Sequence, residues 1–91
     1  MGQRSTGPAW EKELKISRHA QNNMRLYGIT VADVELVLAA PDRRDQEGEY
    51  LIAYRQFFRR FDNLPLKVIY AIEGQLVIVS VYPLRKSYRG S

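Results

Sequence analysis

His19 is the only histidine of the chain and stands near the start of the stretch SRHAQNNMRLYG. Further along, Lys67, Ser80 and Tyr82 fall in two apolar-rich, alternating segments, and Arg85 follows shortly after them. Histidine and hydroxyl side chains exchange protons with a substrate, whereas lysine and arginine stabilise developing negative charge. Metal-independent cleavage of RNA needs only such groups, because the 2′-hydroxyl of the substrate itself attacks the adjacent phosphate.

Other kinds of catalytic site are not indicated. The sequence contains no cysteine and lacks the HExxH, GxSxG and glycine-rich phosphate-loop motifs, so we expect no metal and no cofactor. His19 is the expected general base or acid, with Tyr82 or Ser80 assisting. Lys67 and Arg85 are expected to stabilise the charge of the transition state. For His19 the structural alternative is a residue at a helix border whose side chain is bonded to backbone. For Lys67, Ser80 and Tyr82 the alternative is an ordinary half-exposed sheet face.

Five arginines are candidates for positioning RNA. Arg59 and Arg60 lie among Phe57, Phe58 and Phe61, and aromatic side chains stack on bases in many RNA-binding proteins. More often, such phenylalanines belong to a core or to a surface that docks a protein partner. The complete set of expected RNA-binding residues is Arg18, Arg25, Arg55, Arg59 and Arg60.

The 91 residues suffice for one domain, and their charge is unevenly distributed. Between residues 32 and 50 six acidic side chains accompany two arginines, whereas between 51 and 91 seven basic side chains accompany two acidic ones. A basic C-terminal half favours RNA or an acidic protein as partner, and its alternative is a solvated surface. The longest apolar run, residues 76–81, is too short to cross a bilayer, so we expect no membrane contact. The absence of cysteine fits a reducing compartment, and we expect a cytoplasmic protein.

Two consecutive helices are predicted around the histidine. The first begins after Ser17, a favourable N-cap, and ends at Gly28, which adopts the left-handed conformation at low cost. The second begins at Thr30, which forms a capping-box pattern with Asp33, and ends before Pro41. The buried stripe expected for the first helix consists of Ile16, Ala20, Met24 and Tyr27.

The remaining chain predicts an antiparallel sheet. Strands are expected at residues 50–58, 66–72 and 75–82, a short edge strand at 43–47, and a short extended piece at 13–16. Glu73-Gly74 reads as a two-residue hairpin turn, which places Lys67 opposite Ser80. In that register Tyr82, Leu76 and Ile78 share the face of Lys67. The predicted fold is α+β, with two N-terminal helices packed on three or four antiparallel strands.

The segments SRHAQNNMRLYGITVADVELVLAAPD and LKVIYAIEGQLVIVSVYPLRK resemble a family of small bacterial domains of unknown function with an HAxxRMxxRGIT hallmark. That family is similar to RelE/ParE and BrnT-like toxins of toxin–antitoxin systems. The resemblance implies a RelE-like fold for the domain, which we expect over residues 13–88. The polar, glycine-rich start of the chain predicts a flexible arm over residues 1–12. Asn23 and Tyr27 stand where the hallmark has arginines, which removes two cations from the neighbourhood of His19.

Two functions follow as alternatives. The first is a toxin-like, metal-independent endoribonuclease that acts on RNA, either free or associated with ribosomes. The second is a non-catalytic module of the same fold that binds RNA or an acidic partner such as an antitoxin-like protein. The two missing arginines favour the second function, because fewer cations remain to stabilise a transition state.

Overall fold

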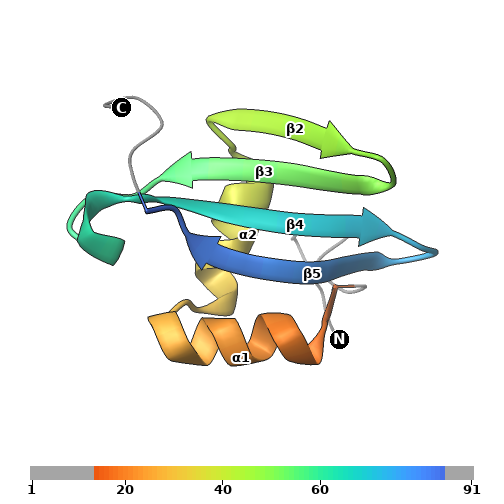
Figure 1. Cartoon of the computed structure of the whole chain (residues 1–91), viewed down its shortest axis with the longest axis horizontal. Coiled ribbons are helices and arrows are strands. Elements are labelled where there is room, and N and C mark those ends of the chain that lie inside the picture. Colours follow the sequence, from red (N-terminus) through yellow and green to blue (C-terminus); the bar gives the residue numbers. More distant parts are fainter. Residues whose placement is uncertain (1–13, 86–91) are drawn as a thin grey trace, which may run out of the picture.

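A computed structural model describes residues 14–85 of the chain. The arm expected at residues 1–12 lies outside the described residues, as do residues 13 and 86–88 of the expected domain. The elements are β1 (Lys15–Ile16), α1 (Arg18–Tyr27), α2 (Val31–Ala39), β2 (Arg43–Glu47), β3 (Tyr50–Gln56), the 3₁₀ helix η2 (Phe61–Asn63), β4 (Pro65–Ile72) and β5 (Leu76–Pro83). As predicted, the fold is α+β, with two helices packed on a sheet (Figure 1).

The sheet has five strands in the order β1-β5-β4-β3-β2 (Figure 1). Strands β2 to β5 form an antiparallel series, whereas β1 pairs with β5 in parallel, with Lys15 opposite Val77. The sequence predicts three or four antiparallel strands, so the observed sheet has one strand more and is mixed. The additional strand is the short extended piece expected before the first helix, whose two residues carry too little pattern to predict a partner.

Local capping explains where both helices begin. The Ser17 hydroxyl accepts a hydrogen bond from the N–H of Ala20 at 3.1 Å and donates one to the carbonyl of Val79 at 2.9 Å. This second bond fixes the start of α1 against β5. In α2, the hydroxyl of Thr30 accepts from the N–H of Asp33, and the Asp33 carboxylate accepts from the N–H of Thr30. The capping box predicted from the sequence is therefore confirmed.

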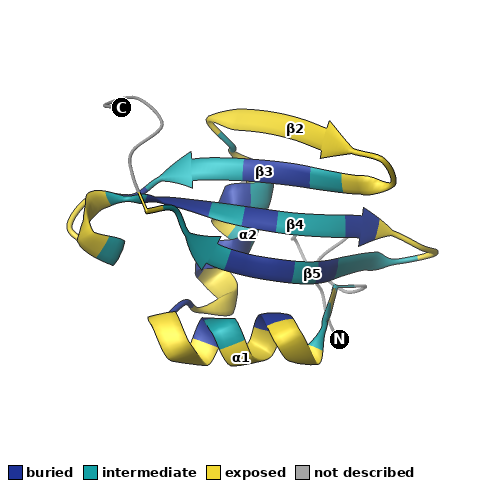
Figure 2. Cartoon of the chain, viewed as in Figure 1, coloured by how far each residue is buried: buried dark blue, intermediate teal, exposed yellow. Residues whose placement is uncertain are grey.

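The core lies between the helices and one face of the sheet (Figure 2). Of the stripe predicted for α1, Ala20 and Met24 are buried, whereas Tyr27 is 45% exposed and does not belong to the core. The buried cluster combines residues of α1 and α2 with the residues of β3, β4 and β5 that face them. Its members are Ala20, Met24, Ile29, Val34, Val37, Ala53, Phe57, Leu66, Val68, Ile78 and Val81.

The register of the β4–β5 hairpin differs from the one expected for a two-residue turn at Glu73-Gly74. The turn contains one residue more, so Ile72 pairs with Leu76. Val79 is then the extra residue of a β-bulge in β5, since the residues on either side of it pair with consecutive residues of β4. Between the turn and the bulge, this one-residue shift turns each side chain of β5 to the sheet face opposite to the one predicted. Ile78 therefore enters the core instead of sharing a face with Lys67.

Beyond the bulge the side chains of β5 point to the predicted faces again. The extra residue in the turn and the extra residue at the bulge together shift the pairing by two residues. Lys67 pairs with Tyr82, two residues further along β5 than the expected partner Ser80. A shift by two keeps every side chain on its original face. The sequence-based prediction that Lys67, Ser80 and Tyr82 share a face is thus confirmed, although the pairing proposed for them is wrong.

Candidate functional site

Four side chains form a row across the sheet face that is turned away from the helices. In Figure 1 this face points towards the reader, and α2 crosses behind the strands. Arg43 of β2 pairs with Tyr54 of β3, Tyr54 with Lys67 of β4, and Lys67 with Tyr82 of β5. These residues alternate along their strands with core residues such as Ala53, so they point to the opposite face. We call Arg43, Tyr54, Lys67 and Tyr82 the cation–aromatic row.

Cations and rings are in contact along this row. The guanidinium carbon of Arg43 lies 5.4 Å from the ring centroid of Tyr54. The Nζ atom of Lys67 lies 5.9 Å from the Tyr54 ring and 5.7 Å from the Tyr82 ring. Cation–π attraction holds the ammonium group of Lys67 between two rings, and all three side chains of β3, β4 and β5 keep partial solvent exposure. The row therefore offers both charge and aromatic faces to a ligand.

Ser80 lies beside the row but differs from it in access. It pairs with Ile69 on the same sheet face, and only 7% of its surface is exposed. A buried hydroxyl is poorly placed to exchange a proton with a polymeric substrate. The structure thus places Ser80 next to Lys67 and Tyr82 while leaving only the latter two accessible.

A pocket of about 700 Å³ opens at the Tyr82 end of the row. Three parts of the chain form its walls: the C-terminal end of α1, the segment around η2, and the end of β5 with the residues after it. Tyr82 belongs both to the row and to the pocket. The lining residues are Leu26, Tyr27, Phe61, Asp62, Leu64, Tyr82, Pro83, Leu84 and Arg85.

His19 is separated from this pocket. It lies in the first turn of α1, whereas Leu26 and Tyr27 line the pocket from the last turn. With a rise of about 1.5 Å per residue, the helix places the histidine roughly 10 Å or more along its axis from the pocket. His19 is exposed, and its side chain makes no hydrogen bond or ion pair within residues 14–85. His19 therefore does not join Tyr82 and Arg85 at the pocket, and its side chain is not bonded to backbone within the described residues.

The five arginines expected to bind RNA have different surroundings. Arg18 and Arg25 are exposed on α1, and Arg59 is exposed in the loop before η2. Arg55 instead donates from Nη1 to the carbonyl of Ala40 at 2.6 Å, so it binds the C-terminal end of α2. The fifth, Arg60, forms a bidentate ion pair.

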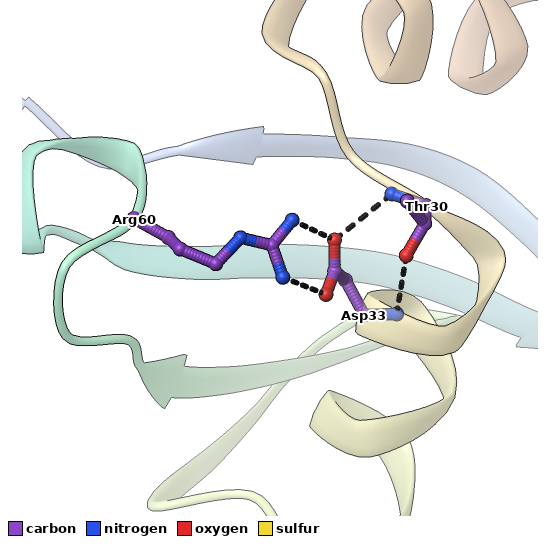
Figure 3. A network of polar contacts seen from close by, with 3 residues as sticks. All are labelled: Thr30, Asp33 and Arg60. Carbon is purple, nitrogen blue, oxygen red and sulfur yellow. Dashed lines mark hydrogen bonds and ion pairs between the residues drawn. The ribbon is translucent and has the colours of Figure 1, made fainter.

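This ion pair joins Arg60 to Asp33 at the start of α2 (Figure 3). Its two N···O distances are 2.5 and 2.6 Å, and the same carboxylate accepts the N–H of Thr30. The guanidinium carbon also lies 4.7 Å from the ring centroid of Phe61 and 5.9 Å from that of Phe57. Burial raises the pKa of Asp33, but the hydrogen bonds from Arg60 and Thr30 outweigh it, so the pKa is lowered.

The loop that carries Arg60 has an unusual backbone. Arg59, Phe61, Asp62 and Asn63 all have φ between 55° and 65°, a region that is costly for residues other than glycine. The Oδ1 atom of Asn63 accepts the N–H of Arg59 at 2.6 Å, and its carbonyl accepts a hydrogen bond from the side chain of Gln56. Such strain persists where surrounding contacts over-determine the backbone, and it is concentrated at ligand sites. Here two of the left-handed residues, Phe61 and Asp62, line the pocket.

The sequence marks Arg60 as a candidate RNA-binding residue but does not predict its ion pair with Asp33. Asp33 is recognisable as a capping residue, but no local pattern indicates its pairing with an arginine 27 residues away. Within residues 14–85 no group of three or more potential metal ligands is present. Neither of the two α-helices in this range is long and apolar enough to cross a membrane.

A model of the family described as a domain of unknown function (DUF4258) matches residues 16–83. The chain belongs to this family. The matched DUF4258 region extends from the end of β1 to the end of β5 and includes the whole cation–aromatic row. The chain has no significant match among curated proteins or among solved structures. The relationship of this DUF4258 domain to RelE/ParE and BrnT-like toxins stays a prediction.

Proposed function

We propose that this DUF4258 protein binds single-stranded RNA on the sheet face that is turned away from its helices. The observation that supports the proposal is the cation–aromatic row, in which two cations and two tyrosine rings lie in register on four neighbouring strands. Single-stranded nucleic acid is bound by aromatic faces that stack on bases and by cations that contact phosphates. Double-stranded helices expose no base faces for such stacking, which favours single strands as the ligand.

The spacing of the row supports contact with a chain of several nucleotides. Neighbouring strands lie roughly 4.8 Å apart, so the row from β2 to β5 covers about 14 Å. Successive nucleotides of an extended strand fit along such a row, with bases on Tyr54 and Tyr82 and phosphates at Arg43 and Lys67. Arg85 extends the positive charge beyond β5. Three cations thus accompany two aromatic faces.

Metal-independent RNA cleavage is a second candidate function. Lys67, Tyr82 and Arg85 are grouped at one end of the hairpin, which favours it: the tyrosine hydroxyl would protonate the leaving 5′-oxygen while both cations stabilise the phosphorane. His19, the expected general base, lies at the other end of α1 from the pocket. Binding is the primary proposal because it requires no proton acceptor at this position.

The proposal is tested by two adjacent arginines of β2 that point to opposite faces. Arg43 pairs with Tyr54 in the row, whereas Arg44 pairs with Ala53, whose side chain is in the core. We expect Arg43→Gln to weaken binding of a fluorescein-labelled, unstructured RNA 12-mer several-fold and Arg44→Gln to leave it unchanged. For three phosphate contacts, a plot of the logarithm of the association constant against the logarithm of the salt concentration should have a slope of about −2. Arg43→Gln should reduce the magnitude of that slope by about 0.7.

Equal effects of the two variants, or affinity independent of salt, would contradict the proposed interface. Binding of an acidic peptide in place of RNA would support a protein-docking module instead. The same mixtures, kept in chelator and analysed for 2′,3′-cyclic phosphate ends, test the second candidate. Cleavage that is lost in Tyr82→Phe while RNA affinity is retained would establish catalysis.

A further inference from the structure

We infer that the pocket at the end of the cation–aromatic row holds the base of one unpaired nucleotide and prefers guanine. This inference deepens the proposed function and rests on it, because the row would deliver the RNA strand to the pocket. The connecting residue is Tyr82, which contacts Lys67 on the sheet face and also lines the pocket. A strand bound along the row therefore reaches the pocket without leaving the protein surface.

The walls of the pocket have the composition of a site for a planar heterocycle. Leu26 is 72% exposed and Tyr27 is 45% exposed, although the sequence predicts Tyr27 to be buried. Opposite this end of α1, Phe61 and Leu64 add further apolar surface. Ligand pockets of a few hundred cubic ångströms combine such apolar walls with a small number of polar groups. Here the polar groups come from Asp62, Tyr82 and Arg85.

The wall formed by the η2 segment is held in place before any ligand arrives. Arg60 is tied to Asp33 by two hydrogen bonds and contacts the Phe61 ring. The neighbouring Asp62 has φ 56° and ψ 32°, a left-handed conformation that the rest of the loop maintains. A preorganised wall lowers the entropy that binding costs, and it fixes the direction in which a base can enter.

The preference for guanine follows from the chemistry of Asp62. Its carboxylate only accepts hydrogen bonds, and it makes no hydrogen bond or ion pair within the described part of the chain. Guanine presents two neighbouring donors, N1–H and N2–H, and a carboxylate accepts both in a bidentate arrangement. Cytosine, adenine and uracil each offer a donor at only one position of that edge. Arg85, which also lines the pocket, is then available for the adjacent phosphate.

The test compares guanosine with inosine, which differs only by lacking the N2 amino group. The probes are fluorescein-labelled RNA 11-mers of adenosine with guanosine or inosine at the central position. We expect the wild-type protein to bind the guanosine probe about tenfold more tightly, as for loss of one hydrogen bond to a charged acceptor. In Asp62→Asn this ratio should fall below about threefold, because the amide offers one acceptor and one donor.

Asp62→Asn is a mild change, since asparagine tolerates the left-handed conformation of residue 62 better than other substitutions. Its thermal midpoint should equal that of the wild type. The matched control is Lys67→Gln, which should weaken both probes equally and leave the guanosine-to-inosine ratio at about ten.

Three outcomes contradict the inference in distinguishable ways. Equal affinity of the wild type for both probes, with Lys67→Gln still weakening them, overturns the guanine pocket and leaves RNA binding intact. A guanosine preference that survives in Asp62→Asn assigns the preference to another part of the protein and overturns the role of Asp62. Absence of binding to either probe overturns the proposed function, and the pocket with it.

Discussion

Replacing Asp33 by asparagine should destabilise the protein in a pH-dependent manner. The carboxylate accepts hydrogen bonds from the N–H of Thr30 at 2.9 Å and from both terminal nitrogens of Arg60. An amide keeps one oxygen acceptor and turns an N–H₂ group towards donors. Only 5% of the surface of Asp33 is exposed, so solvent replaces little of what is lost.

The magnitude follows from the part of the network that is shielded from solvent. One buried hydrogen bond to a charged acceptor, together with weakening of the α2 cap, contributes about 1.5 to 2 kcal/mol. The ion pair with Arg60 contributes nothing to this figure, because the Arg60 side chain is 44% exposed and solvent screens the contact. For a domain of this size the thermal midpoint should fall by roughly 10 °C at pH 7.

The sign of the pH dependence follows from the lowered pKa of Asp33. Because the folded state holds the carboxylate charged more firmly than the unfolded state does, the stabilisation is complete above the ordinary value of 3.8 and is lost as the pH falls through the lowered folded pKa. The difference between wild type and Asp33→Asn should therefore be constant from pH 7 to about pH 5 and shrink on further acidification.

The assay is thermal unfolding followed by circular dichroism from pH 7 to pH 2.5. Glu73→Gln, the same type of change at an exposed residue of the β4–β5 turn, is the control and should behave like the wild type. A midpoint for Asp33→Asn within about 2 °C of the wild type at pH 7 would refute the reasoning. So would a difference that grows as the pH is lowered, since the pKa of Asp33 would then be raised by folding.

Two further predictions concern α1. His19→Ala should change the free energy of unfolding by less than about 0.5 kcal/mol, because the side chain is exposed. It should also leave RNA affinity within about twofold of the wild type. A large loss of affinity with unchanged stability would show that His19 belongs to the functional site. Gly28→Ala should cost about 1 kcal/mol or more in chemical denaturation, because residue 28 has φ 69° and ends the helix in the left-handed region. An unchanged unfolding midpoint for this variant would show that the turn after α1 adopts another backbone conformation.

Features that depend on neighbouring residues could be predicted from the sequence. The caps at Ser17 and Thr30, the end of α1 at Gly28 and the order of helices and strands all appear as predicted. Each is decided within a few residues by hydrogen bonding of a side chain or by the conformational freedom of glycine. For the same reason the alternation along β4 correctly separates Lys67 from its core neighbour Val68.

Features that depend on distant parts of the chain were decided by the tertiary structure. An additional residue in the turn and the bulge at Val79 moved Lys67 from Ser80 to Tyr82, and pairing register depends on the sum of such insertions along both strands. The bidentate contact of Arg60 with Asp33 and the left-handed loop around it join segments that have no common local pattern. His19 and Tyr82 have the residue types of a catalytic pair, but the direction of α1 across the sheet places the histidine at one end of the helix and the pocket at the other. Residue type is a property of the sequence, whereas the distance between two residues far apart along the chain is set by how the elements pack.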